Sequence, residues 1–96
     1  MNTRVVARKK LLADRKDEAL AIYREMIELT RKEEGCVAYD LAQSNDDPDL
    51  VAVIESWESM DALNAHIASE HFGRLIPQLD EFTAEEYPIE IYTEIM

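Results

Sequence analysis

The sequence predicts an α+β fold whose elements follow in the order strand, helix, strand, strand, helix, strand. Three observations support this prediction. Several short stretches alternate apolar and polar residues or are continuously apolar, as strands do. Two longer stretches repeat their apolar residues with helical spacing. No linker, internal repeat or low-complexity tract interrupts the 96 residues, so residues 1–96 are expected to form a single domain.

The first strand and the first helix are predicted from residues 3–34. In Thr3–Lys10, Val5 and Ala7 share one face, which indicates a strand. A helix is expected from the acidic positions after residue 16 to about Glu34, because acidic side chains suit the positive end of the helix dipole. Its apolar stripe consists of Ala19, Ile22, Tyr23, Met26, Ile27 and Thr30. Gly35 then supplies the left-handed conformation that ends a helix.

Two further strands are predicted on either side of a polar loop. Cys36–Gln43 alternates, with Val37, Tyr39 and Leu41 on one face. The stretch from residue 44 to residue 49 has the composition of a loop. Leu50–Trp57 is apolar on both faces until Glu55, which is typical of a central strand covered on both sides.

The second helical region is predicted to consist of two pieces. It begins near Met60, but its apolar stripe changes face, and a break within Ser69–Gly73 corrects this, with Ser69 capping the second piece. Pro77 would weaken or kink that piece unless it lies near the first turn. After Pro88, the final strand is expected over Ile89–Ile95. The side chains expected to face the core are Ile89, Ile91, Thr93 and Ile95.

This order of elements is that of the split βαβ, ferredoxin-like fold, with a four-stranded antiparallel sheet and both helices on one face. The first strand should then lie between the fourth and the third, so Arg4 and Arg8 should face Glu90 and Glu94 on one side and Glu55 on the other. The opposite sheet face stays bare. Its apolar side chains would be Val6, either Leu50 and Ile54 or Val51 and Val53, and one row of the last strand. Because such a face is normally buried, we expect a homodimer joined sheet to sheet.

Composition excludes several classes of function. The chain has 10 Lys and Arg against 21 Asp and Glu, and only Arg74 is basic beyond residue 32. A nucleic-acid partner is therefore disfavoured. Two glycines cannot form the usual nucleotide-binding loops. No membrane span or signal peptide is expected, and the single Cys36 fits a reducing, cytoplasmic location.

Two stretches carry a resemblance to a known family. They are Gly35-Cys36-Val37-Ala38-Tyr39-Asp40-Leu41 and the segment from Glu55 to Phe72, with the patterns Gly-Cys-x-x-Tyr, Glu-x-Trp and Ala-His-x-x-Ser-x-x-Phe. Over nearly its whole length the chain resembles the antibiotic biosynthesis monooxygenase (ABM) family of dimeric α+β barrels. The resemblance implies a cavity between the sheet and the helices of each subunit. Family members include haem-degrading enzymes, isomerases, and quinol monooxygenases that need no flavin, haem or metal.

Haem degradation is not expected. The haem-degrading members use an Asn on the first strand, a Trp on the second helix and a His further along it. This sequence has Ala7, His66 and Ile76 at roughly these positions. The resemblance is closer to the quinol-oxidising members, so no cofactor is expected.

The candidates for catalysis are His66, Trp57, Tyr39 and Glu55. A quinol must lose a proton before it passes an electron to O2, and His66 is the expected base because imidazole accepts a proton near neutral pH. Glu70, one helical turn later, could hold the imidazolium. Trp57 and Tyr39 would orient the substrate, with Glu55 in support. The structural alternatives stay open: packing for His66 and Trp57, a backbone partner for the Tyr39 hydroxyl, and an ion pair of Glu55 with Arg4 or Arg8.

The expected substrate-binding residues are Tyr23, Met26, Leu63 and Phe72, although the same spacing is also typical of core residues. His71 is expected at the rim or the surface. Cys36 is expected to be a small buried hydrophobic residue. No metal site is expected, because one Cys and two His at this spacing do not converge on one helix face.

The leading functional hypothesis is a cofactor-independent monooxygenase that oxidises a small, planar, hydroxylated aromatic molecule with O2. One alternative is an isomerase of a small carbonyl compound, which needs the same base but no oxygen. The other is a dimeric module that binds a small molecule without catalysis.

Overall fold

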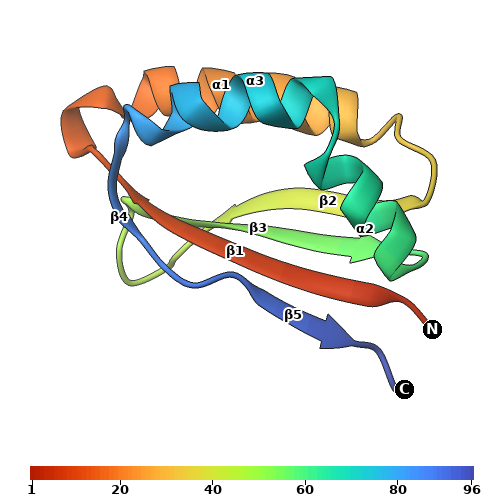
Figure 1. Cartoon of the computed structure of the whole chain (residues 1–96). Helices are drawn as coiled ribbons and strands as arrows, with labels where there is room; N and C mark the ends of the chain where they lie inside the picture. Colours follow the sequence, from red (N-terminus) through yellow and green to blue (C-terminus); the bar gives the residue numbers. More distant parts are fainter.

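Strand β1 (Thr3–Leu11) runs through the interior of an antiparallel sheet whose one face is covered by helices (Figure 1). The structure is a computed structural model that describes residues 1–96. After β1 come the 3-10 turn η1 (Ala13–Arg15), α1 (Lys16–Thr30), β2 (Cys36–Gln43), β3 (Leu50–Trp57), α2 (Met60–Ile67), α3 (Glu70–Asp80), β4 (Thr83–Glu86) and β5 (Glu90–Thr93). The predicted α+β, ferredoxin-like arrangement is confirmed.

The sheet has the order β2-β3-β1, with β4 and β5 both paired to the outer edge of β1. This is the predicted neighbour relation. The prediction of one last strand over residues 89–95 was incomplete, because β4 pairs with the end of β1 and β5 pairs with its beginning. Pro88 lies between the two segments and has no N–H to donate to a strand ladder, which explains the interruption.

The hydrophobic core lies between the sheet and the pair formed by α1 and α3, which lie side by side above it (Figure 1). The helices bury Ala19, Tyr23, Met26, Leu75 and Leu79, and the sheet buries Val5, Val51, Val53 and Trp57. The strands therefore place their apolar rows as period-two alternation requires.

Helix α1 ends at Thr30, so the prediction that it runs to about Glu34 was wrong. Glu33 lies in a turn closed by a hydrogen bond from the N–H of Cys36 to its carbonyl oxygen. Gly35 has the predicted left-handed conformation, with φ of 84°. A Cβ atom on Gly35 would lie 2.6 Å from Cβ of Ala62, so glycine also permits the start of α2 to approach this turn.

The predicted break in the second helical region is confirmed. Helix α2 ends at Ile67, and the hydroxyl of Ser69 caps α3 by accepting a hydrogen bond from the N–H of Phe72. Pro77 lies inside α3, past its first turn, and the helix continues to Asp80. None of the helices is both long enough and apolar enough to cross a membrane.

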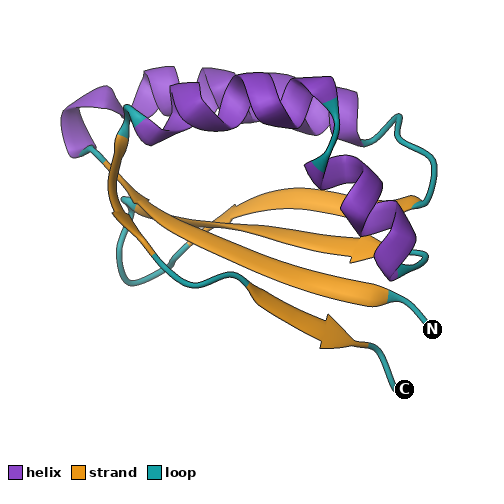
Figure 2. Ribbon diagram, in the orientation of Figure 1, coloured by secondary structure: helices purple, strands orange, loops and turns teal.

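Strand β5 lies at the rim of the sheet, where no helix covers it (Figure 2). Ile91 lies opposite the inward-facing Val5 and, like Ile89, lines the space between the sheet and the helices, so the predicted face is correct for these two residues. Ile91 is nevertheless 52% exposed, so it is not part of the buried core. The flanking residues Ile89 and Ile95 and the strand residue Thr93 are exposed as well.

The face of the sheet opposite the helices is open. It carries Val6 and its sheet partner Ile54. Val51 and Val53 are buried on the helix side, so the row of β3 on the open face is that of Leu50 and Ile54. A second subunit on this face stays a prediction.

The predicted charge pairing across the sheet is confirmed only in part. Arg4 forms an ion pair of 3.4 Å with Glu94. The guanidinium of Arg8 instead lies 4.8 Å from the ring centre of Tyr87. Glu55 is opposite Val5 in the sheet and faces the helices, so neither arginine reaches its carboxylate; Arg4 donates only to its backbone carbonyl.

Candidate active site

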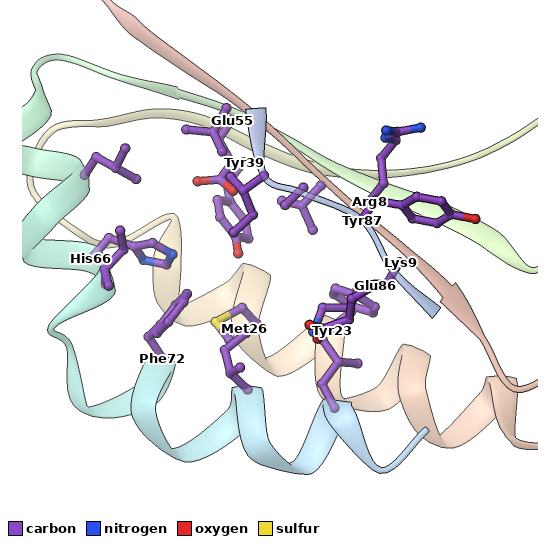
Figure 3. Close-up of a pocket in the computed structure, with 18 of the residues that line it drawn as sticks. Arg8, Lys9, Tyr23, Met26, Tyr39, Glu55, His66, Phe72, Glu86 and Tyr87 are labelled. Carbon is purple, nitrogen blue, oxygen red and sulfur yellow. Dashed lines mark hydrogen bonds and ion pairs between the residues drawn. The ribbon is translucent and has the colours of Figure 1, made fainter. Parts of the chain in front are cut away.

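A cavity of about 410 Å³ lies between the sheet and the helices, and most of its wall is apolar (Figure 3). Its size falls within the range of pockets that hold small organic molecules. The four predicted substrate-binding residues, Tyr23, Met26, Leu63 and Phe72, all line it. The same residues belong to the hydrophobic core or pack against it. They are therefore both core residues and cavity-lining residues, as their spacing allowed. Their role in substrate binding stays a prediction.

His66 projects from the last turn of α2 into this wall, and the residue is 1% exposed (Figure 3). Its Nδ1 lies 2.6 Å from Oε2 of Glu33, whereas Nε2 is buried without a hydrogen-bond partner. Burial lowers the pKa of His66, and the hydrogen bond with Glu33 opposes this effect. The lowered pKa favours the neutral imidazole, whose Nε2 is then available to a molecule in the cavity.

Aromatic rings hold the imidazole in place. Its centre lies 4.8 Å from the ring centre of Trp57 and 5.1 Å from that of Phe72. Trp57 is 0% exposed and lies behind the cavity wall, so it contacts His66 and Glu55 and does not itself line the cavity. Its indole N–H donates a hydrogen bond of 2.9 Å to Oε1 of Glu55.

Glu55 enters the cavity wall from β3 as a carboxyl group that is 5% exposed and has no cationic partner. The alternative of an ion pair with Arg4 or Arg8 was therefore wrong. Burial raises the pKa of Glu55 to about 7, while the hydrogen bond from Trp57 opposes the rise. Near neutral pH this group can thus give or take a proton.

Tyr39 comes from β2 and points its hydroxyl into the cavity, where it makes no hydrogen bond within the chain (Figure 3). Its ring centre is 5.4 Å from that of His66. Burial raises the pKa of Tyr39, so the hydroxyl keeps its proton and can donate to a ligand. The backbone partner considered as an alternative is not found.

Three chemical groups therefore converge on one cavity from α2, β3 and β2. His66 offers an unpartnered nitrogen, Glu55 a carboxyl group that titrates near neutrality, and Tyr39 a hydroxyl. Such groups in an apolar wall can bind an aromatic molecule that carries hydroxyl or carbonyl oxygens and can move its protons.

The surroundings of His66 differ from those expected. Glu70, the predicted partner, pairs with Arg74 at 2.8 Å on the surface. The partner is Glu33, whose Oε2 also lies 3.0 Å from Nε2 of His71. His71, which was expected at the rim or the surface, is partly buried: its side chain is 13% exposed, and the break between α2 and α3 places it beside Glu33.

The ligand-type atoms of Glu33, His66 and His71 lie within 4.8 Å of one another. The prediction from the sequence considered one helix face alone and did not include Glu33, which the turn after α1 brings to the two histidines. The absence of a metal site stays a prediction. Helical spacing could not have revealed Glu33; the one signal in the sequence was Gly35, which ends the helical region close to it.

The other end of the cavity is also closed by residues that the sequence did not indicate. Lys9 donates hydrogen bonds of 2.9 Å to both Asp80 and Glu86. These residues come from β1, α3 and β4, so the unpredicted strand β4 contributes part of the wall.

Comparisons with known proteins agree with this geometry. Residues 3–78 match the family described as "Antibiotic biosynthesis monooxygenase". The chain belongs to this ABM family. A conserved protein from Methanosarcina mazei Go1 is 33% identical with a TM-score of 0.96, over 99% of this chain and 94% of that one.

Two further relatives of this ABM-family chain are bacterial. Rv0793 of Mycobacterium tuberculosis, named as a candidate monooxygenase, is 36% identical over 77 residues, which cover 80% of this chain and 75% of Rv0793. The uncharacterized protein sll1783 of Synechocystis is 26% identical over 83 residues, 86% of this chain. The match spans 56% of sll1783.

Proposed function

We propose that this ABM-family protein is a cofactor-independent monooxygenase that uses O2 to oxidise a small, planar, quinol-like aromatic molecule. The observation that carries the proposal is His66 Nε2, a buried and unpartnered nitrogen in an apolar cavity. Because burial lowers the pKa of His66 and so favours the neutral ring, this nitrogen can act as a base.

The proposed reaction balances in atoms and electrons. His66 takes the proton of a quinol hydroxyl, and the quinolate passes an electron to O2, which gives a semiquinone and superoxide. These combine at a ring carbon that carries hydrogen. Loss of that hydrogen as a proton cleaves the O–O bond, and the proton held by His66 returns to the leaving oxygen. This step releases water, regenerates the neutral imidazole and leaves a hydroxylated quinone. Every electron that reduces O2 comes from the quinol, so the reaction needs no other reductant.

The remaining cavity residues have roles that follow from their positions. Tyr39 and Glu55 would hydrogen-bond the substrate oxygen that His66 does not contact. Trp57 would keep Glu55 and His66 in place from behind the wall. The apolar walls exclude water, which favours charge transfer between the bound quinolate and O2. The side chains expected to contact the ring are Tyr23, Met26, Leu63 and Phe72.

The proposed assembly is a homodimer joined through the open face of the sheet. Ile54 is 38% exposed there and Tyr92 is 51% exposed, opposite Arg4 in the same sheet. Burying such a face against its own copy removes these apolar side chains from water. A cytoplasmic location fits the free thiol of Cys36.

Oxygen consumption tests the proposal. Purified, metal-free protein is mixed with a series of hydroquinones and naphthohydroquinones, and O2 uptake and hydroxylated products are measured. We expect uptake that falls by roughly 10²–10⁴-fold in His66→Ala, the range for loss of a catalytic base. Asn64→Ala, on the exposed side of the same helix, is the matched control. Uptake unchanged in His66→Ala would refute the base assignment.

One observation favours a second candidate, isomerisation of a small carbonyl compound. Glu55 has a pKa of about 7 and shares the cavity with His66, so one group could remove a proton and the other return it. Turnover of an enolisable ketone without O2 would support this function over oxidation. Binding of quinols without any turnover would indicate a module that only binds.

A further inference from the structure

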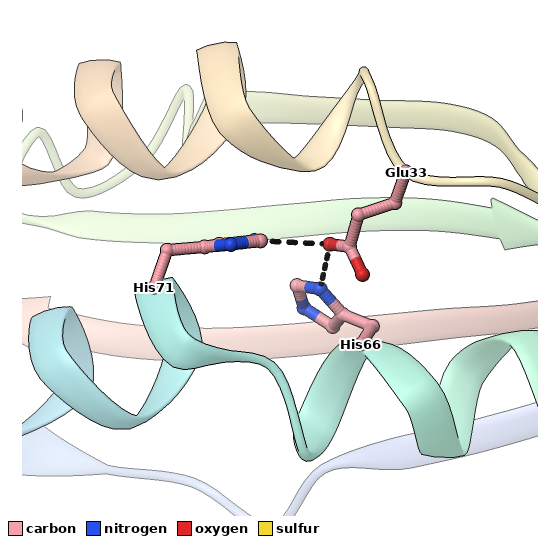
Figure 4. Close-up of side chains that lie close together, drawn as sticks. All are labelled: Glu33, His66 and His71. Atoms are coloured by element: carbon pink, nitrogen blue, oxygen red, sulfur yellow. Dashed lines mark hydrogen bonds and ion pairs between the residues drawn. The ribbon is translucent and has the colours of Figure 1, made fainter.

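Behind the cavity wall, the carboxylate of Glu33 lies between two imidazoles that come from different helices (Figure 4). Its Oε2 is 2.6 Å from Nδ1 of His66 and 3.0 Å from Nε2 of His71. The side chains of these residues are 17%, 2% and 13% exposed, in that order. No Lys or Arg pairs with Glu33, so the two rings are its polar neighbours.

This arrangement defines which nitrogen of His66 carries the proton. An ionised carboxylate only accepts hydrogen bonds, so Nδ1 of His66 must be the N–H that donates to Glu33. The lone pair is then on Nε2, the nitrogen without a partner. Nε2 of His71 lies 3.0 Å from the same oxygen and can donate to it in the tautomer that carries a proton on this nitrogen.

We propose that Glu33 is a positioning residue that holds His66 in the tautomer whose Nε2 accepts a proton, and that stabilises the imidazolium formed when it does. His71 shares the same oxygen atom, so it restrains the carboxylate and weakens its attraction for the proton on His66. The catalytic part of this inference rests on the proposed function. The tautomer and the protonation of His66 do not, because both are measurable without substrate.

The same three groups could in principle bind a metal ion, but the geometry favours a hydrogen-bonded cluster. Ligand atoms around Zn²⁺ lie ~2.0–2.2 Å from the ion and therefore roughly 3.3 Å from each other. The oxygen of Glu33 and the nitrogen of His66 are only 2.6 Å apart. A metal on Nδ1 would also force the proton onto Nε2 and remove the lone pair that the base needs.

Nitrogen-15 NMR of histidine-labelled protein tests the positioning role directly. The charged or titratable groups that face His66 are Glu33, His71 and Tyr39, with Glu55 in the same cavity. We expect His66 of the wild type to show a protonated Nδ1. In Glu33→Gln the pH midpoint of His66 should fall by about one pH unit, because the imidazolium loses its carboxylate.

His71→Ala should move the same midpoint in the opposite direction. Without His71, the oxygen of Glu33 interacts with His66 alone, so the imidazolium is stabilised more strongly and the midpoint rises. Glu34→Gln is the matched control, because Glu34 is exposed, adjacent in sequence and loses the same charge. It should leave the midpoint and the tautomer unchanged. Opposite shifts in the two variants would not arise from a merely structural role.

Kinetics complete the test. With a quinol that the wild type oxidises, Glu33→Gln should lower kcat by roughly 10–100-fold with little change in KM, and the pH profile should shift with the NMR midpoint. If the wild type oxidises no quinol but the NMR results are as expected, the proposed function is wrong and the positioning role of Glu33 stands. Failure of this inference appears as a wild-type His66 protonated at Nε2, or shifts in Glu33→Gln no larger than in Glu34→Gln.

Addition of Zn²⁺ tests whether the three residues form a metal site. We expect no stoichiometric binding by calorimetry and no change of the His66 signals at one equivalent of the metal. Tight binding of Zn²⁺ that is lost in both Glu33→Gln and His71→Ala would overturn the hydrogen-bonded assignment. Thermal unfolding of each variant, compared with Glu34→Gln, verifies that the folded protein is being measured.

Discussion

The indole N–H of Trp57 donates a 2.9 Å hydrogen bond to Oε1 of Glu55, two residues earlier on β3, and both side chains lie on the helix side of the sheet. They are 0% and 5% exposed. A carboxyl group in such a place must be hydrogen-bonded or neutral to be tolerated, and here it has one donor and no cation. The pair connects the hydrophobic core to the cavity.

Glu55→Gln should change how stability depends on pH. Folding raises the pKa of Glu55 from 4.5 to about 7, so the folded protein binds more protons than the unfolded chain in this interval. The contribution of this group to the free energy of unfolding is fully present below pH 4.5 and is lost as the pH rises through about 7. Glutamine has no charge to bury. At pH values above about 7, the free energy of unfolding of the variant should therefore exceed that of the wild type by up to about 3 kcal/mol.

Urea unfolding of both proteins at about pH 5 and about pH 8.5 measures this difference. The titrations of other groups, His66 included, cancel to first order when the variant is subtracted from the wild type. A difference in unfolding free energy that is the same at both pH values would show that Glu55 is not protonated by burial.

Trp57→Phe should raise the pKa of Glu55 further, because the hydrogen bond from the indole favours the ionised carboxylate. Loss of that bond and of ring volume in a fully buried position should also cost about 2–4 kcal/mol of stability. Carbon-13 NMR of the Glu55 carboxyl carbon gives the pKa. A pKa that falls or stays constant would contradict the role of the indole donor.

Gly35→Ala should destabilise the protein and disturb the base. The residue has φ of 84°, and its new Cβ would meet Cβ of Ala62 in α2 at 2.6 Å. Strain in the left-handed region and overpacking should together cost about 2–4 kcal/mol. Because the contact pushes on the helix that carries His66, the NMR signals of that ring should shift as well.

Gly73→Ala is the matched control for this substitution. Gly73 lies within α3, and a Cβ there would have no atom within 4 Å. Alanine should therefore stabilise the helix by about 0.5–1 kcal/mol. Thermal unfolding of the two variants should move the midpoint in opposite directions; equal destabilisation would contradict the reason given for Gly35.

Ile54→Lys should dissociate the proposed dimer. Ile54 is 38% exposed on the open face of the sheet, opposite Val6. A lysine there would place like charges near each other across a two-fold interface and remove an apolar contact. Light scattering after size-exclusion chromatography should show half the wild-type mass.

Met60→Lys controls for the added charge. Met60 is 45% exposed but lies at the start of α2, away from the open face, so its substitution should leave the mass unchanged. A wild type that is monomeric at all concentrations would refute the sheet-to-sheet assembly outright.

Local sequence determined most of the elements of this protein. Alternation predicted β1 and β2, and a continuously apolar stretch predicted β3. The change of apolar face predicted the break that Ser69 caps. These signals depend on residues that are close in the chain. The resemblance to the ABM family predicted the cavity and placed His66, Tyr39 and Glu55 in its wall. The short acidic strand β4 carried no alternation, so pattern alone could not predict it.

Tertiary structure decided the partners of these residues. His66 was expected to meet Glu70 at helical spacing, but the turn after α1 and the break after α2 bring Glu33 and His71 to it from distant parts of the chain. In the same way, Glu55 lost its expected arginine partner because the pleat directs Arg4 and Arg8 to the other face of the sheet. Sequence spacing determines which side chains share a face, whereas the packing of helices on the sheet determines which charges meet.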